Sequence, residues 1–170
     1  MKNFLLGIVA TLVALGLGTF VYLRLGFAEV RADLPPAAWE MQLFPTFVRA
    51  SVQRRAPRIP NPYPTTDALL IEGGKVYLEG CAGCHGGLDK PDENSGALFP
   101  PAPDFPRAGT AYTETQIFWI AKHGLRRTGM FAAGMFNSDE KLWKAAAFIY
   151  HIKSLPPNVK AALEEKKAAP

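Results

Sequence analysis

The chain has 170 residues, of which 48% are hydrophobic and 20% are charged, so the composition predicts a single folded core. Its 15 prolines and 15 glycines follow no repeating period, which excludes a collagen-like or low-complexity chain. Two cysteines are too few for a disulfide-stapled secreted scaffold. The net charge is +4, but residues 67–170 are formally neutral. With no clustered basic face in that region, the sequence argues against a nucleic-acid-binding protein.

The first part of the chain has the pattern of a membrane anchor. Residues 4–23 carry no charge and are bounded by Lys2 and Arg24. At 1.5 Å per residue such a helix is about 30 Å long, the thickness of a bilayer core, so we expect one transmembrane helix within an anchor of residues 1–27. A cleaved signal peptide is the alternative, but its apolar region is about 7–15 residues long and ends at a small-x-small site. The candidate site near Ala28 is poor, and the flanking charges are too even to orient the helix.

Residues 28–66 are predicted to form a linker, because seven prolines interrupt them and favour extended backbone. One short helix is expected within the linker, with Pro45 at its first position and Arg55 at its end. Its apolar contacts would be Phe47, Val48 and Val52. Arginines give residues 31–66 a charge of +3. These arginines form a solvated face, or they contact anionic lipid headgroups or a partner.

Residues 81–85 read C-A-G-C-H, the C-x-x-C-H motif of c-type haem attachment. In such a motif two thiols add to the two vinyl groups of one porphyrin, and the adjacent imidazole becomes the proximal iron ligand. A structural zinc site would need a second pair of Cys or His ligands, and the two other histidines stand singly. A thioredoxin-like redox pair would need a strand–helix context, which the following sequence lacks. The motif therefore predicts one covalently attached haem c, bound by Cys81, Cys84 and His85, with His85 as an iron ligand.

A second axial ligand is expected from the methionines that follow the motif. Met130 and Met135 both lie in a glycine-containing loop, which allows the backbone to approach the porphyrin edge closely. A thioether is a soft, neutral ligand that favours ferrous iron and raises the reduction potential. On these grounds either methionine is a candidate.

Three helices are predicted around the motif, each beginning at a capping residue. Their N-caps are Thr66, then Thr113 in a capping box with Gln116, and finally Asn137 or Ser138; they end at the haem motif, at Gly124 and before Pro156 and Pro157. The proline-rich residues 86–112 are expected to wrap one haem edge. We expect a haem domain over residues 67–157 and a charged tail over residues 158–170.

Residues 67–156 resemble the class I c-type cytochromes. In that family a glycine eight residues before the first cysteine and an aromatic four residues before it pack on an aromatic of the last helix, and Gly73, Tyr77 and Phe148 match those positions. Residues 117–130 look like the bacterial form of the distal loop, in which the methionine after Thr-Gly is the ligand. The resemblance thus selects Met130 as the second iron ligand. It also implies that a proline carbonyl, from Pro100 or Pro101, receives the proximal imidazole proton.

The resemblance implies an all-α fold of three to four helices around one covalent haem, here with an N-terminal transmembrane helix. Such proteins are electron carriers rather than enzymes, and their haem is attached outside the cytoplasm. We therefore expect a single-pass protein of the cytoplasmic membrane, with its haem domain on the periplasmic side. Its expected partners are the membrane and redox proteins, with no nucleic acid and no small-molecule substrate. Two roles stay open: electron transfer between a membrane donor and an acceptor, and an integral subunit of a respiratory, photosynthetic or dehydrogenase complex.

Overall fold

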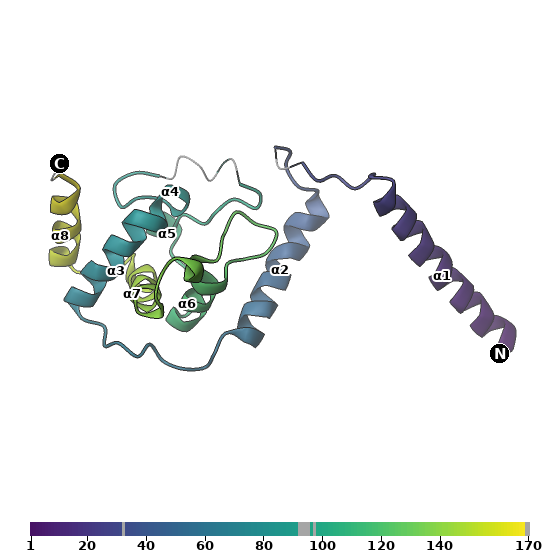
Figure 1. Ribbon diagram of the computed structural model, residues 1–170, viewed down its shortest axis with the longest axis horizontal. Helices are drawn as coiled ribbons and strands as arrows, with labels where there is room; N and C mark the ends of the chain where they lie inside the picture. The colour runs from purple at the N-terminus through teal and green to yellow at the C-terminus, as the bar shows by residue number, and fades with distance from the viewer. Residues whose placement is uncertain (32, 92–95, 97, 169–170) are drawn as a thin grey trace. The chain divides into compact units, whose positions relative to one another are not determined.

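The computed structural model describes residues 1–31, 33–91, 96 and 98–168, and the backbone alone for 165–168 (Figure 1). The chain divides into two units, Met1–Leu34 and Pro35–Pro170. Every regular element of the described residues is a helix, so the predicted all-α class is confirmed.

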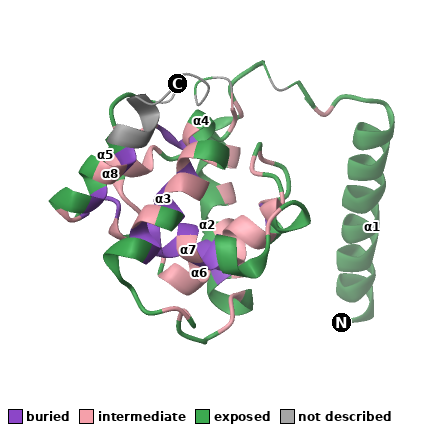
Figure 2. Cartoon of the chain, turned by 60° about the vertical axis from the view of Figure 1, so that its left-hand side comes forward, coloured by how far each residue is buried: buried purple, intermediate pink, exposed green. Residues whose placement is uncertain are grey.

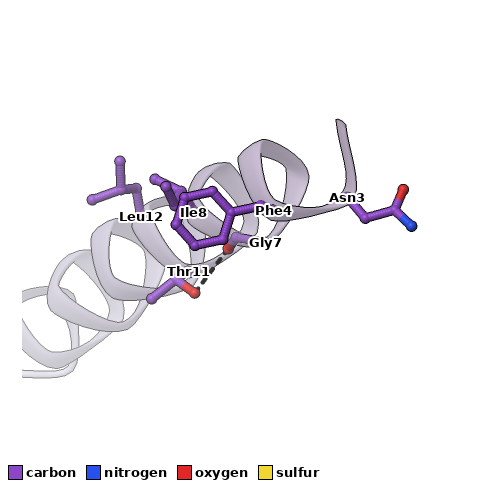
Figure 3. Close-up of a pocket in the computed structure, with 6 residues that line it drawn as sticks. All are labelled: Asn3, Phe4, Gly7, Ile8, Thr11 and Leu12. Atoms are coloured by element: carbon purple, nitrogen blue, oxygen red, sulfur yellow. Dashed lines mark hydrogen bonds between the residues drawn. The ribbon is translucent and has the colours of Figure 1, made fainter. Parts of the chain in front are cut away.

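The first unit consists of helix α1, Lys2–Arg24, which contains the predicted span and has no buried residue. Its mean hydropathy of 2.4 and its length make it a candidate membrane span. Figure 2 shows it exposed along its whole length. The Thr11 hydroxyl donates to the Gly7 carbonyl at 2.9 Å, which satisfies its hydrogen bond within the helix, as an apolar environment requires. A surface recess on the same helix is lined by Asn3, Phe4, Gly7, Ile8, Thr11 and Leu12 (Figure 3).

The second unit is built on three helices that pack around one core: α3, Asp67–Gly80; α6, Glu114–His123; and α7, Asp139–His151. Their predicted N-caps are confirmed. Thr66 accepts a hydrogen bond from the Leu69 amide, Thr113 and Gln116 form the capping box, and Ser138 rather than Asn137 caps α7. Helix α7 packs against both α3 and α6, so it joins these two helices in the core.

The crossing of α3 and α7 depends on a glycine. A Cβ atom at Gly73 would overlap the Lys144 carbonyl oxygen and lie 3.0 Å from Phe148 Cβ, so only glycine allows the helices to approach this closely. One turn later Tyr77 packs on Phe148 with ring centroids 5.3 Å apart, and both side chains are fully buried. The family-derived pairing of these three residues is therefore confirmed.

An ion-pair network braces the same crossing at the surface. Lys144 Nζ on α7 bonds Glu72 on α3 and Glu140 one turn away on its own helix. Hydrogen bonds to Glu140 and Glu72 hold the pKa of Lys144 above its usual range, and the bond from Lys144 lowers the pKa of Glu72. Both groups are therefore charged at neutral pH.

Helix α2, Ala38–Arg55, begins seven residues before the short helix predicted in the linker, and Pro45 lies inside it rather than at its start. Glu40 caps this earlier start by accepting from the Ala37 amide at 3.1 Å. Val52 is fully buried as expected, but Phe47 is 57% exposed, so the expectation that it packs inward is wrong.

The second half of the predicted linker is attached to the haem domain rather than extended away from it. Thr115 Oγ1 donates to the Ile59 carbonyl at 2.7 Å, and Asn61 Nδ2 donates to Glu114 Oε2 at 2.9 Å. Helix α2 also packs on α6. The compact unit consequently starts at Pro35, and the linker predicted over 28–66 overestimates the free chain.

Residues 158–168 of the expected charged tail are helical. Helix α8, Pro157–Ala168, packs on α3, and its Val159 and Leu163 are buried. These two residues stand four apart and therefore share one face of the helix. The tail predicted over 158–170 thus contributes to the core, because this face covers Gly74, where a Cβ would lie 2.6 Å from Leu163 Cδ1.

Replacing Leu163 by alanine is expected to destabilise the haem-loaded protein by about 2–5 kcal/mol, the usual effect of removing a buried leucine side chain. The measurement is the free energy of unfolding in guanidinium chloride. The exposed Lys160 on the same helix provides the matched control, and Lys160→Ala should change stability by less than about 0.5 kcal/mol. Equal effects of the two substitutions would contradict the packing of α8.

Candidate haem site

The C-x-x-C-H motif forms a single helical turn, α4, Ala82–His85, directly after α3. The Cys84 and His85 amides both donate to the Cys81 carbonyl, at 3.1 and 2.9 Å. Cys81 is partly buried, Cys84 is exposed, and neither forms a disulfide. The turn thus brings both predicted thiols and the predicted imidazole together at the end of α3.

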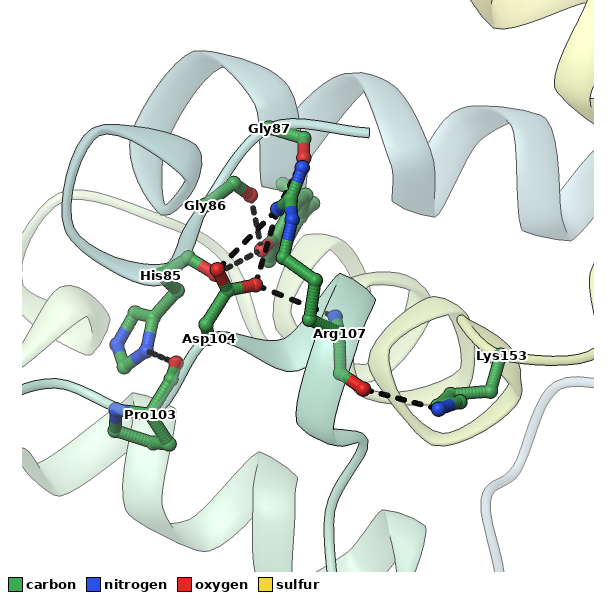
Figure 4. Close-up of polar contacts among 8 residues, drawn as sticks. His85, Gly86, Gly87, Pro103, Asp104, Arg107 and Lys153 are labelled. Carbon is green, nitrogen blue, oxygen red and sulfur yellow. Dashed lines mark hydrogen bonds and ion pairs between the residues drawn. The ribbon is translucent and has the colours of Figure 1, made fainter. Parts of the chain in front are cut away.

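The ring of His85 is fixed on two sides. The residue is 8% exposed, and its ring stacks on Phe105 at a centroid distance of 4.6 Å. Its Nδ1 atom lies 2.9 Å from the Pro103 carbonyl oxygen (Figure 4). Because a carbonyl only accepts, Nδ1 carries the proton and donates, which leaves the lone pair on Nε2, the arrangement of a metal-binding imidazole.

The acceptor of that proton corrects the sequence analysis, which expected Pro100 or Pro101. Pro103 takes this position because the next residue, Asp104, caps the short helix α5, Phe105–Ala108, and so fixes the backbone there. Arg107 Nη1 on α5 bonds both Asp104 Oδ1, at 3.0 Å, and the Gly87 carbonyl, at 2.9 Å (Figure 4). These bonds connect the Pro103 segment to the residues that follow His85.

The Tyr77 hydroxyl connects the motif to α3, a role that the sequence analysis did not identify. It lies 2.9 Å from the His85 carbonyl oxygen and 2.6 Å from the Gly86 carbonyl oxygen. Gly86 has a φ of 86°, and a Cβ there would lie 2.7 Å from Asp104 Oδ1, so the chain turns away from the motif at a position that needs glycine.

The Asp-x-Pro pattern after Pro103 is a sequence signal for the start of α5, but no local pattern indicates that the Arg107 side chain bonds the Gly87 carbonyl.

Met130 lies in a closed loop after α6. The Leu125 amide donates to the Met130 carbonyl at 3.0 Å, and Thr128 Oγ1 donates to the Leu125 carbonyl and accepts from the Met130 amide. Gly124 has a φ of 65°, and a Cβ there would lie 2.7 Å from the Met130 carbonyl oxygen, so the loop closes on a glycine. Met130 is partly buried, whereas Met135, in the 3-10 helix η2, Ala133–Met135, is 77% exposed.

The electrostatics of the Cys81 thiol follow from its burial. Burial, with a smaller contribution from Cys84, raises the pKa of the Cys81 thiol to about 11. At neutral pH an unattached Cys81 is therefore protonated. Among the described residues, no three His, Cys, Asp or Glu side chains gather as a metal-binding group, so the part of the chain that the structure covers offers no zinc site of the kind weighed above.

These residues fit a covalently held haem. Two thiols stand three positions apart on one turn, and a buried imidazole beside them has its tautomer set by a backbone carbonyl. A loop held by Gly124 and Thr128 carries a thioether. One nitrogen and one soft sulfur donor form the ligand set of electron-transfer haems.

Comparison with known proteins supports this assignment. Residues 68–149 match the family model described as cytochrome C oxidase, cbb3-type, subunit III. No curated protein and no solved structure matches significantly. The match begins within α3, includes the motif and the Met130 loop, and ends within α7, the elements that build the site. This part of the chain is accordingly a c-type cytochrome domain of the class I type.

Proposed function

We propose that the protein is a membrane-anchored carrier of single electrons, with one haem c attached through Cys81 and Cys84 and bound axially by His85 and Met130. When bound, the haem supplies a reversible one-electron change at its iron. The observation that supports the proposal most strongly is the buried His85, whose Nδ1–H is directed to the Pro103 carbonyl within the C-x-x-C-H turn.

The protein's own residues hold and tune the site. The Pro103 carbonyl orients the His85 ring and increases the basicity of Nε2. Stacking on Phe105 excludes water from one face of the imidazole. Partial burial and the Thr128 hydrogen bonds favour Met130 over the exposed Met135 as the sixth ligand. A soft thioether opposite an imidazole stabilises the ferrous state, so a high reduction potential is expected.

The proposed location follows from α1 and the haem motif together. Helix α1 crosses the cytoplasmic membrane once, with the amino terminus inside and the haem domain on the periplasmic side, where c-type haem is attached. The domain exchanges electrons with redox proteins or a membrane complex, and needs no nucleic acid or small-molecule substrate. The haem domain over 67–157 stays part of this proposal, with α2 and α8 packed on it.

Replacing both Cys81 and Cys84 by serine is expected to abolish haem that survives denaturation, because no thioether bond can form. Each single substitution should leave one unreacted vinyl group, which is visible as a red shift in the pyridine haemochrome spectrum. Gly83 gives a matched control: it lies between the cysteines, and a Cβ there meets nothing within 4 Å, so Gly83→Ala should retain haem. Haem bound to the double variant after denaturation would contradict c-type attachment.

Removing residues 1–24 and supplying a cleavable export signal is expected to give a soluble protein with an unchanged haem spectrum. The reason is that the haem residues and the core all belong to the unit that begins at Pro35. Fractionation and visible spectroscopy test this directly. A truncated chain that is soluble but binds no haem would show that α1 contributes to the folded domain.

A second role, as an integral subunit of a larger complex, is favoured by the description of the matching family, a subunit of a cbb3-type oxidase. Solubilisation in mild detergent followed by mass measurement distinguishes the two roles. A free carrier elutes as a small particle with one haem, whereas a subunit elutes together with partner polypeptides and their additional cofactors.

A further inference from the structure

Helix α2 carries an exposed apolar stripe that the proposed electron transfer does not use. Trp39, Leu43 and Phe47 are spaced four residues apart, so they share one side of the helix. Their exposed fractions are 64%, 44% and 57%. Three large apolar side chains in one exposed row mark a surface that contacts something other than water.

The opposite side of α2 is already occupied. Val52 is fully buried there, and Phe44 and Val48 are partly buried. The contact with α6 and the bonds to Ile59 and Asn61 hold the helix on the haem domain. The stripe formed by Trp39, Leu43 and Phe47 is therefore presented outward by a helix that is fixed on its other side.

We propose that this stripe binds the surface of a membrane that contains anionic phospholipids, so that α2 is a second, peripheral membrane contact. The inference rests on the proposed anchoring through α1. Only residues 25–37 separate the two helices, a length of chain that reaches at most about 45 Å. Helix α2 consequently stays within reach of the bilayer that holds α1.

The chemistry of α2 matches the interfacial region of a bilayer. Tryptophan is the side chain most typical of that region, and leucine and phenylalanine insert beside it. Four arginines follow or flank the stripe, against a single acidic residue, Glu40, that is engaged in capping the helix. They are Arg49, Arg54, Arg55 and Arg58. Apolar insertion combined with arginines in the headgroup layer favours lipid with negative charge.

A spin-label accessibility measurement tests the proposal on the full-length, haem-loaded protein in vesicles. Because thioether bonds consume both native thiols, one introduced cysteine can be labelled selectively. We would label Leu12→Cys in α1, Leu43→Cys in the stripe and Lys160→Cys in α8, in vesicles of phosphatidylcholine with and without phosphatidylglycerol. Collision of each label with oxygen, which partitions into lipid, is compared with collision with a water-soluble nickel chelate.

With anionic lipid, the label at position 43 should become more accessible to oxygen than to the chelate, as at position 12, while position 160 stays accessible to the chelate. Combining Arg49→Gln, Arg54→Gln and Arg58→Gln should remove the effect of phosphatidylglycerol at position 43, whereas Lys160→Gln should not. Each of these results supports the proposal.

Lipid exposure at position 12 with full chelate access at position 43 would overturn the α2 contact and leave the anchor intact. Chelate access at both positions would overturn the anchor as well, and the α2 contact with it. Protection of position 43 in native membranes but not in anionic vesicles would identify a protein as the occupant of the stripe and would also overturn the proposal. The anchoring through α1 and the membrane contact of α2 are therefore tested separately.

Discussion

Met130→Ala is expected to lower the reduction potential by on the order of 0.1 V or more. The substitution removes the soft neutral ligand that stabilises ferrous iron, and the choice of axial ligands moves haem potentials over a span of ~0.8 V. Water or another side chain would then take the sixth position. Equilibrium redox titration beside the unaltered protein measures the change, and loss of the weak near-infrared band of sulfur-bound ferric iron reports the ligand directly.

Met135→Ala is the matched control for this experiment. Its side chain is 77% exposed in η2, so its removal should leave the spectrum and the potential near those of the unaltered protein. A drop in potential confined to Met135→Ala would reassign the sixth ligand to Met135. It would also imply that the loop closed by Gly124 and Thr128 serves only to shape the approach to the haem.

Gly73→Val is expected to prevent accumulation of the folded, haem-loaded protein. The first carbon of any side chain at this position overlaps the Lys144 carbonyl oxygen, and a backbone atom cannot move aside as a flexible side chain can. Separating α3 from α7 also disrupts the Tyr77–Phe148 contact and, with it, the anchorage of the C-x-x-C-H turn. The yield of haem protein and the free energy of unfolding of any product are the measurements, with a loss of about 3 kcal/mol or more expected.

Gly80→Ala supplies the control on the same helix. A Cβ at that position meets nothing within 4 Å, so haem yield should be unchanged and stability unchanged or slightly higher. Equal yields of haem protein from Gly73→Val and Gly80→Ala would contradict the close approach of α3 to α7.

The features predicted successfully from the sequence depend on short-range chemistry. Thr66 and the Thr113–Gln116 pair are recognised as caps because the side chain and the amide it bonds lie within three residues. The spacing of Gly73 and Tyr77 from the motif is equally local, and the family resemblance supplied their distant partner, Phe148. The ligand assignment of Met130 still awaits its redox test.

The features that the sequence did not predict depend on contacts between distant segments. Five prolines in residues 86–112 offered several carbonyl acceptors for His85, and the segment that contains Pro103 is held by the Arg107 bond to Gly87, twenty positions away. Val159 and Leu163 are two large apolar residues in a short segment rich in lysine and glutamate, and their burial depends on the contact of α8 with α3, where Leu163 lies against Gly74. Similarly, the prolines between α2 and α3 suggested free chain, because the bonds that hold Ile59 and Asn61 come from α6.

Attachment of these linker residues has a kinetic consequence for an anchored carrier. A freely diffusing cytochrome meets its partners at a rate set by its bulk concentration, whereas one anchored in a membrane is confined to the layer of solvent that its tether can reach. Because α2 and the segment after it belong to the folded unit, only the 13 residues 25–37 separate α1 from α2. The start of α2 should therefore stay within about 45 Å of the end of α1, so that encounters with donors in the same membrane depend on the density of the protein in that membrane rather than on a bulk concentration.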